Sequence, residues 1–393
     1  MSEQQHVHPM ADRLKLLAQT SRESLMGKLL RQFWQPVARS EMLEPGKTRP
    51  LRILGEDLTL YRGESGRPYL VGGRCPHRLT LLHSGWVQGD NIRCMYHGWQ
   101  FDGAGRCLQR PAEDDGGRPP NVKIPGYPLH EYCGLVFAYM GEGPAPEFEL
   151  PRKDAFERPG DLLFTREETW PCNWFQLIEN SMDALHLSFV HHWGEVGTLG
   201  QVVTATIPQL EYTETEAGIR QIATRSKTSR RVSDWTFPNN NHISQPGLTP
   251  DDPWIDVGIW ATPIDDTHTK RFFVYSIPSS TPEADQRITR HFEEFGEYNP
   301  ADYHDDLFVY KRLPNEKLIQ LTSAQDYVAV VGQGALVDRP SERLAKSDIG
   351  IAFLRRIFWR ELQAVRDGHA TKRWRKLDHA TDMVRQTRET VDA

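Results

Sequence analysis

Two short segments constrain this chain more than any other feature, because each offers one cysteine and one histidine at close spacing. The first reads Cys75-Pro-His77 and the second Cys94-Met-Tyr-His97, with sixteen residues between them. Both segments stand in turn-like sequence, so each loop brings one thiolate and one imidazole to the same place. A fold that uses them must hold two loops side by side.

The mixed pairs decide between two kinds of metal site. Zinc fingers group their cysteines in one pair and their histidines in another pair on a helix, whereas each pair here is mixed. The pattern therefore favours a [2Fe–2S] cluster in which one iron has two cysteines and the other has two histidines, an arrangement that raises the reduction potential. Zinc is the second candidate. The other cysteines, Cys107, Cys133 and Cys172, are predicted to be packing residues.

Length and composition limit the remaining possibilities. The 393 residues predict two domains, and a formal net charge of −6 offers no basic surface for nucleic acid. Five cysteines are too few for a disulfide framework in a chain of this length, and an odd number cannot all be paired. The N-terminus lacks the pattern of a signal peptide, and no apolar run of about 18 residues occurs, so we predict a cytoplasmic protein without a membrane span.

The pattern of apolar and polar residues changes twice along the chain. Apolar residues at helical spacing predict a helical segment over 11–33, and short alternating runs with tight turns predict an all-β module over 34–143. A proline-rich link over 141–160 precedes a helix near 173–192, a strand-rich middle and a helical end. We therefore predict an α+β protein with three parts: 1–35 packing on the last part, 36–145 carrying the cluster, and 146–393 forming an antiparallel sheet covered by helices.

A second motif lies in the stretch ENSMDALHLSFVHHW, where Asp183, His186 and His191 form D-x2-H-x4-H. Asp183 and His186 can share a helix face. His186 and His191 are about 140° apart on an ideal helix, so both can reach one metal only where the helix bulges or ends. Alone, the motif is equally typical of core or capping histidines, and His192 is an alternative to His191.

The runs CPHR, CMYHGWQFDGAGRC and YPLHEYCGLVFAYMG resemble the Rieske domain of the Rieske non-haem iron oxygenases, over most of the first 145 residues. The resemblance implies a cluster held by Cys75, His77, Cys94 and His97. Respiratory Rieske proteins carry a loop disulfide where this chain has Thr80, which points to the oxygenase or ferredoxin branch. The residues RCMYHGWQFDGAGRCLQRPAE are similar to those of the single-chain branch that includes phthalate dioxygenase and the vanillate and dehydrodivanillate O-demethylases.

The same resemblance implies a mononuclear Fe(II) held by His186, His191 and one distant carboxylate, the set that leaves positions open for dioxygen and substrate. The candidate carboxylates are Asp302, Asp305, Asp306, Asp326 and Asp338. We favour Asp326, because a carboxylate beside the apolar run DYVAVVG is costly unless it is paired or bound to metal. It also resembles the family's third ligand, an Asp at the start of a C-terminal helix. The alternative role for Asp326 is a helix N-cap, and Asp338 is expected to be ion-paired.

The resemblance alone implies a role for Asp183. It links a histidine ligand of the cluster in one subunit to a histidine ligand of the mononuclear iron in the next subunit. This role implies a homo-oligomer, a trimer or stacked trimers. Asn180 matches a family position near the iron. The sequence lacks a nucleotide-binding motif, so we expect electrons from NADH or NADPH to arrive only through a separate reductase, with or without a ferredoxin.

The expected activity is hydroxylation of an aromatic acid by O2, with oxidative O-demethylation of a methoxylated aromatic acid as the alternative. An electron-transfer or sensor protein with a vacant iron site is the alternative of another class. A carboxylate substrate favours an arginine in the pocket; the candidates are Arg220, Arg225, Arg230 and Arg231. Four aromatic residues either wall the pocket or form core: Trp235, Phe237, Trp254 and Trp260.

Overall fold

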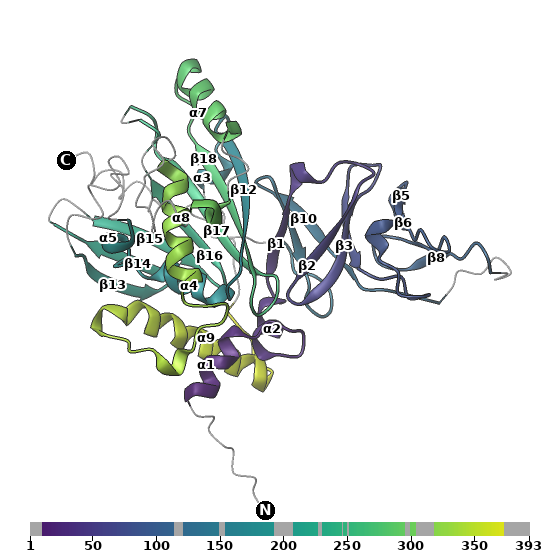
Figure 1. Ribbon diagram of the computed structural model, residues 1–393, viewed down its shortest axis with the longest axis horizontal. Helices are drawn as coiled ribbons and strands as arrows, with labels where there is room; N and C mark the ends of the chain where they lie inside the picture. Colours follow the sequence, from purple (N-terminus) through teal and green to yellow (C-terminus); the bar gives the residue numbers. More distant parts are fainter. Residues whose placement is uncertain are drawn as a thin grey trace, which may run out of the picture. The chain divides into compact units, whose positions relative to one another are not determined.

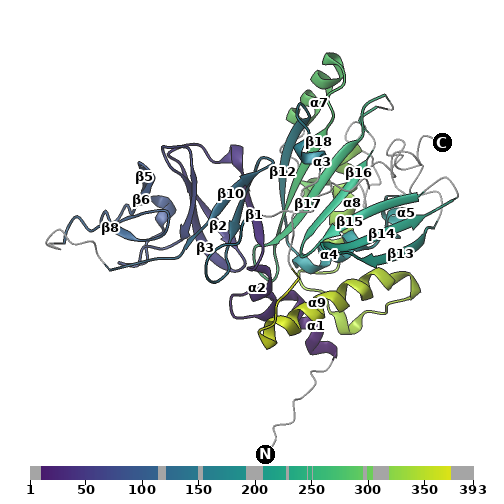
Figure 2. The same cartoon turned by 180° about the vertical axis from the view of Figure 1, so that it is seen from behind.

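The computed structural model describes residues 10–113, 121–148, 154–191, 207–226, 230–245, 247–249, 251–294, 299–303 and 318–372. Two compact units divide the chain (Figures 1 and 2). One comprises Leu30–Phe148, and the other comprises the described parts of Met1–Leu29 and Glu149–Ala393. Each unit is described by itself below.

The first unit consists of three small antiparallel sheets. The sheet in the order β1-β11-β10 is built from β1 (Trp34–Arg39), β10 (Leu129–Tyr132) and β11 (Leu135–Tyr139). The sheet in the order β2-β3-β4-β9 is built from β2 (Thr48–Ile53), β3 (Glu56–Arg62), β4 (Pro68–Gly72) and β9 (Gly126–Tyr127). The sheet in the order β5-β6-β7-β8 is built from β5 (Trp86–Gln88), β6 (Asn91–Arg93), β7 (Gln100–Phe101) and β8 (Cys107–Gln109).

Tight turns set the register of this unit. The hairpin between β2 and β3 turns through Leu54 and Gly55, whose φ angles are both positive at 51° and 78°. Cys133 and Gly134 connect β10 to β11 in the same way, with φ angles of 50° and 74°. Two-residue loops with positive φ at both positions match the twist of paired strands. The predicted all-β module is therefore confirmed.

The second unit is built on a seven-stranded antiparallel sheet in the order β12-β18-β17-β16-β15-β14-β13 (Figure 1). The strands are β12 (Leu162–Trp170), β13 (Gln209–Glu214), β14 (Gly218–Thr224), β15 (Arg230–Thr236), β16 (Asn240–Gln245), β17 (Ile255–Pro263) and β18 (Thr269–Ile277). The α-helices within the described residues are α1 (Met10–Ala18), α2 (Leu25–Leu30), α3 (Asp154–Glu157), α4 (Trp174–Met182), α5 (Leu187–Val190), α7 (Pro282–Glu294), α8 (Leu318–Val331) and α9 (Ile349–Asp367). The predicted α+β class is confirmed, and none of the described helices is long and apolar enough to cross a membrane.

Aromatic packing joins the helices to this sheet. The ring of Phe358 on α9 lies 5.1 Å from Phe175 on α4 and 4.8 Å from Phe237 after β15, measured between centroids. Trp235 is 1% exposed and also packs on Phe358. Trp235 and Phe237 are therefore core residues, and so is Trp260, which is buried.

Three predicted helix boundaries are wrong, and local hydrogen bonds explain the first two. The predicted segment 11–33 is two helices, since Ser24 Oγ accepts a hydrogen bond from Gly27 N and begins α2. The predicted helix near 173–192 ends at Met182, where its carbonyl oxygen accepts hydrogen bonds from Tyr212 Oη and Gln221 Nε2 instead of continuing the helix. Asp326 lies inside α8 and not at its start.

Glu214 on β13 ties the end of the described chain to the sheet. It accepts hydrogen bonds from Arg360 Nη2 at 2.7 Å and from Lys372 Nζ at 3.1 Å. These bonds, led by the one from Arg360, lower the pKa of Glu214 from 4.5 to about 2. Because the pKa of Glu214 is lower in the folded state than in the unfolded state, its ionised form stabilises the fold. This stabilisation is complete above the pKa of the unfolded state and is lost as the pH falls through the pKa of the folded state.

We predict that Glu214→Gln lowers the free energy of unfolding at pH 7 by about 1 kcal/mol, a small effect because the carboxylate is partly exposed. The difference from the wild type should close as the pH falls from about 4.5 toward 2. Urea titrations across this pH range check it, with Glu211→Gln, an exposed position on the same strand, as the control. A difference that persists at pH 2, or an equal loss in the control, would contradict the assignment.

Candidate metal centres

The two Cys-His loops of the first unit have the same backbone design. In one loop Cys75 N donates to Thr80 O at 2.8 Å, and in the other Cys94 N donates to Trp99 O at 2.8 Å. The fifth residue of each loop has a positive φ angle, 62° at Leu79 and 72° at Gly98. A glycine adopts this conformation without strain, whereas a leucine does so at a cost, as is frequent near functional sites.

The loops place the thiols inside the unit and the imidazoles at its surface. Cys75 and Cys94 are each 2% exposed, while His77 is exposed. The rings of His77 and His97 lie 4.4 Å apart between centroids. Burial and the nearby Cys94 thiol raise the pKa of Cys75 to about 11, so without metal Cys75 favours the thiol over the thiolate. Two adjacent buried sulfurs and two adjacent imidazoles fit a [2Fe–2S] cluster with mixed ligands.

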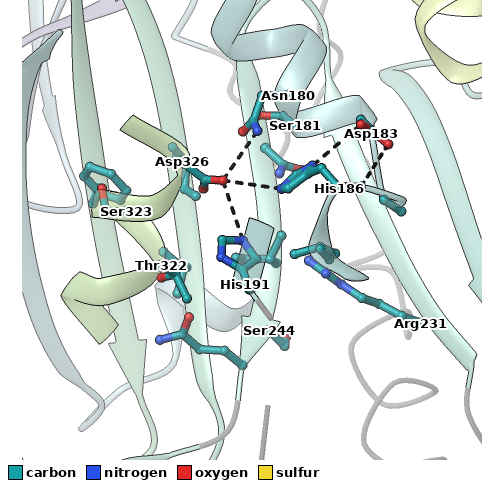
Figure 3. Close-up of a pocket in the computed structure, with 18 of the residues that line it drawn as sticks. Asn180, Ser181, Asp183, His186, His191, Arg231, Ser244, Thr322, Ser323 and Asp326 are labelled. Carbon is teal, nitrogen blue, oxygen red and sulfur yellow. Dashed lines mark hydrogen bonds and ion pairs between the residues drawn. The ribbon is translucent and has the colours of Figure 1, made fainter. Parts of the chain in front are cut away.

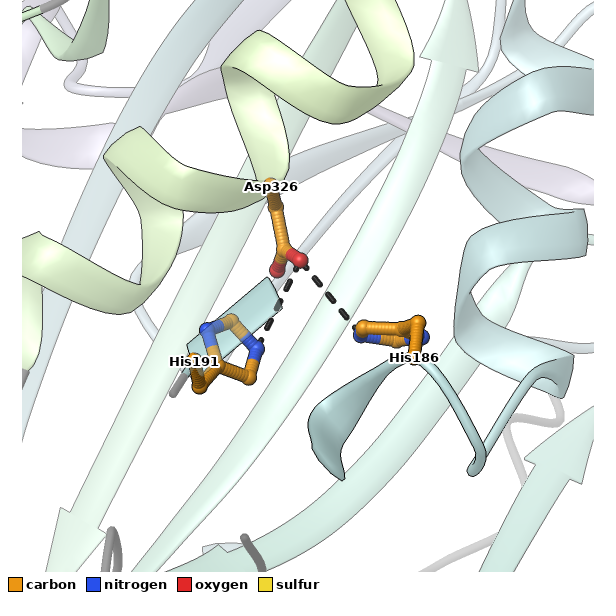
Figure 4. Close-up of side chains that lie close together, drawn as sticks. All are labelled: His186, His191 and Asp326. Atoms are coloured by element: carbon orange, nitrogen blue, oxygen red, sulfur yellow. Dashed lines mark ion pairs between the residues drawn. The ribbon is translucent and has the colours of Figure 1, made fainter. Parts of the chain in front are cut away.

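The second candidate centre lies in the second unit, at the break between α4 and α5. His186 immediately precedes α5 and His191 immediately follows it, so one helical turn separates them. Asp326 faces both from α8 (Figure 4). The three side chains each offer one ligand atom, and these atoms lie within 4.8 Å of one another. The break in the helix is the irregularity that the spacing of the two histidines requires.

The distances at this centre leave a place for one ion. Asp326 Oδ1 lies 3.4 Å from His186 Nε2 and 3.6 Å from His191 Nε2. The two imidazole rings are 5.5 Å apart between centroids. Two imidazoles and one carboxylate on one side of a site form the donor set of non-haem Fe(II) enzymes, which leaves coordination positions open. The residues present therefore fit a mononuclear iron.

The charges of the centre support the same donor set. Burial alone would raise the pKa of Asp326, but the two histidines and Arg271 lower it to about 2, so the carboxylate is ionised at neutral pH. Burial, with the charges of His186 and Arg231, lowers the pKa of His191. For His186, burial is outweighed by the hydrogen bond and charge of Asp326, which raise the pKa. Metal binding at His186 therefore competes with protonation of its ring.

Neighbouring side chains orient the three candidate ligands (Figure 3). Gln325 Oε1 lies 2.8 Å from His191 Nδ1, which fixes the ring so that Nε2 faces Asp326. Asn180 Nδ2 donates to Asp326 Oδ1 at 3.4 Å. Asp183 Oδ2 lies 4.0 Å from His186 Nδ1, and Asp183 Oδ1 accepts the backbone N–H of Leu185 at 2.8 Å. Sequence reasoning missed Gln325, since its role depends on contact between α8 and α5.

A cavity of about 120 Å³ opens beside the three side chains. Its lining includes Asn180, Asp183, Arg231, Arg271, Phe273 and Tyr275, together with residues of β16 and β17. Phe273 and Tyr275, on β18, are the aromatic lining, and they differ from the four aromatic residues considered from the sequence. Alternation along β18 puts Arg271, Phe273 and Tyr275 on one face, but only the fold shows that this face meets the cavity.

The other carboxylate candidates lie elsewhere or outside the described residues. Asp302 is exposed and accepts a hydrogen bond from Asn299. Asp338 accepts a hydrogen bond from Ser341, whereas its neighbour Arg339 pairs with Glu179. Asp305, Asp306 and His192 lie outside the described residues.

Comparisons with known proteins identify the family. The Rieske [2Fe-2S] domain model matches residues 33–128. The 5,5'-dehydrodivanillate O-demethylase oxygenase subunit of Sphingobium sp. is 33% identical over 370 residues, covering 91% of this chain and 81% of that protein. The phenoxybenzoate dioxygenase alpha subunit of Ectopseudomonas oleovorans is 32% identical over 368 residues, covering 87% and 83%. The structure of NdmA from Pseudomonas putida CBB5 shares the fold, with a TM-score of 0.67 at 20% identity over 88% of this chain and 94% of that one.

The chain therefore belongs to the Rieske non-haem iron aromatic ring-hydroxylating oxygenases, as an alpha subunit of the branch that contains phthalate dioxygenase and dehydrodivanillate O-demethylase. It is an oxidoreductase, and its first unit is a Rieske [2Fe-2S] domain. The resemblance drawn from the sequence is thus confirmed.

Gln325 gives a prediction about the second centre. Gln325→Leu keeps the volume of the side chain but removes the oxygen that holds His191 Nδ1. We expect the affinity for Fe(II) at this centre to fall about 10–100-fold, as measured by Fe(II) titration of the apo-site, with the cluster's visible absorption unchanged. Gln333→Leu, at an exposed position after α8, is the control. Unaltered Fe(II) affinity in Gln325→Leu would exclude the positioning role.

Proposed function

We propose that this chain is a terminal oxygenase component that receives electrons from a separate reductase, uses O2 and hydroxylates an aromatic acid. The observation that carries the proposal is the convergence of His186, His191 and Asp326 on one side of a cavity. Iron bound by these three residues supplies the activation of dioxygen beside the substrate. A Rieske domain in the same chain supports a supply of electrons to that centre.

The chain's own residues perform the remaining tasks. Asp326 stays ionised and binds metal as an anion, while Asn180 holds its Oδ1 in place. Gln325 sets the tautomer of His191. Phe273 and Tyr275 give the cavity an aromatic side against which a planar ring can lie.

The first unit offers the surface through which electrons arrive. His77 is exposed at the cluster loops, and the nearby apolar side chains of Leu79, Met95 and Tyr96 are 62%, 56% and 53% exposed. Exposed apolar residues grouped around a redox centre are typical of a docking surface. We propose that this surface meets a separate protein, either a reductase or a ferredoxin, and a second copy of this chain within a trimer or stacked trimers.

Oxidative O-demethylation is the second candidate reaction. It is supported by the relative named as an O-demethylase oxygenase subunit, at 33% identity over 91% of this chain. Both reactions need the same metal ligands, and the position of the substrate over the metal decides between them. The alternative of another class is an electron-transfer protein or a sensor with a vacant iron site. Metal analysis of the purified protein decides this directly, because it measures whether iron is bound at the second centre.

A single-turnover experiment tests the proposal. The protein is loaded with Fe(II), reduced without air, and then exposed to isotopically labelled O2 with a panel of carboxylated and methoxylated aromatics. Two labelled oxygens in one product indicate a dioxygenase, and formaldehyde release indicates O-demethylation. Asp326→Ala should lose this iron and all product while the cluster still reduces, whereas Asp302→Ala should behave as the wild type. Iron that stays bound in Asp326→Ala would overturn the proposed centre.

Asp183 provides a separate prediction about electron transfer. Its Oδ2 lies 4.0 Å from His186 Nδ1, and 31% of its side chain is exposed, so this oxygen can accept a hydrogen bond from another subunit. Asp183→Asn should keep both metal centres and slow reoxidation of the reduced cluster by at least about tenfold, since each 1.4 kcal/mol added to a barrier is tenfold in rate. Stopped-flow absorption of the cluster during turnover checks this. Wild-type reoxidation rates in the variant would rule out a bridge at Asp183.

A further inference from the structure

A second cavity lies in the same unit as the candidate iron centre, where α1 meets α9, and we call it the α1–α9 cavity. Figures 1 and 2 show these two helices side by side. The cavity has a volume of about 730 Å³, within the range of roughly 300–1,000 Å³ that is usual for ligand pockets. Among the described residues, it shares no lining side chain with the cavity beside His186, His191 and Asp326.

Helical spacing gives the α1–α9 cavity an apolar wall. Leu14 and Leu17 stand one turn apart on α1, and Ala352 and Trp359 stand two turns apart on α9, so each pair lies on one face of its helix. Leu344 adds a further side and is 49% exposed. Apolar side chains that line a cavity of this size and stay partly open to solvent are typical of a binding site.

Acidic residues balance two of the arginines that line this cavity. Glu179 on α4 accepts hydrogen bonds from Arg339 Nη1 at 2.5 Å and from Arg355 Nε at 2.6 Å. Glu342, which also lines the cavity, accepts hydrogen bonds from the same two arginines at 3.3 Å and 2.8 Å. The two negative and two positive charges of this cluster therefore cancel.

Arg13 and Arg356 add positive charge to the cavity, and neither forms an ion pair with a described residue. Each guanidinium lies over an aromatic ring instead, Arg13 at 4.9 Å from the centroid of Trp359 and Arg356 at 4.7 Å from that of Phe353. Arg13 Nε is buried, and no described group accepts a hydrogen bond from it. Arg339 is 5% exposed, and its Nη2 has no partner within the described parts of the chain either. Buried donors without an acceptor are costly, so an anion in this cavity would relieve that cost.

We propose that the α1–α9 cavity is a second ligand site, which binds an amphipathic organic anion of the fatty-acid class. The alkyl chain lies along the leucines of the apolar wall, and the carboxylate lies at Arg13, Arg339 and Arg356. Guanidinium groups bind both oxygens of a carboxylate, and an alkyl chain gains free energy when it leaves water. This site is separate from the proposed reaction, because its residues belong to another cavity.

Equilibrium dialysis of decanoate with the purified full chain tests this proposal. The comparison probes are uncharged decanamide, cationic decyltrimethylammonium and the short anion acetate. Decanoate should bind at least about tenfold more tightly than each of them, since it alone combines the chain with a negative charge. Arg13→Gln and Arg356→Gln should each weaken decanoate by about tenfold or more. Ala352→Trp, at an exposed position of α9, should remove this binding by filling the cavity.

Arg366→Gln is the matched control, because it removes an exposed guanidinium of α9 that lies outside the cavity. The visible absorption of the cluster and the circular dichroism report folding in every variant. The proposal is overturned if decanamide binds as tightly as decanoate, if Ala352→Trp keeps full binding, or if Arg13→Gln and Arg366→Gln have equal effects. Displacement of decanoate by an equal concentration of benzoate would also overturn it, because decanoate would then occupy the cavity beside the candidate iron centre.

Discussion

The ionised carboxylate of Asp326, held away from most solvent, is the constraint on which the second unit depends. Its side chain is 15% exposed, and a charge in that position is unfavourable unless opposite charges and hydrogen bonds surround it. His186 and His191 converge on it from both ends of α5, and Asn180 donates to it from α4. Each of these elements must therefore end or turn where it does for the carboxylate to be stable, with or without a metal.

The end of α4 links that carboxylate to the sheet. Tyr212 on β13 and Gln221 on β14 donate to the carbonyl of Met182, which fixes where the helix stops and where His186 begins the next turn. The same β14 leads directly to Arg225, and its partner β15 carries Arg231. Strands β13, β14 and β15 thus position both the end of α4, which precedes His186, and Arg231 in the cavity lining.

The sequence predicted the parts of both centres that depend on local spacing. The two Cys-His loops, His186 and His191 were found because their ligands are near neighbours along the chain, and Asp326 was selected by the cost of its apolar surroundings even though its place in α8 was wrong. Gln325 was missed because its role needs two distant helices in contact. That Arg231 lines the cavity and Arg220 does not was out of reach for another reason: the faces of β14 and β15 are set by a register that single-sequence patterns leave open.

The uneven balance of charge in the cavity bears on which reaction the protein performs. Glu168 lies 3.6 Å from Arg271 and balances its charge, whereas no ion pair is recorded for Arg231, the other arginine in the lining, among the described residues. The side chains of Phe273 and Tyr275 give the cavity an aromatic side against which a planar group can pack. Catalytic outcome depends on which atom is held near the reacting centre. Under the proposed function, the shape of this cavity therefore decides whether a ring carbon or a methoxy carbon lies nearest the three candidate ligands.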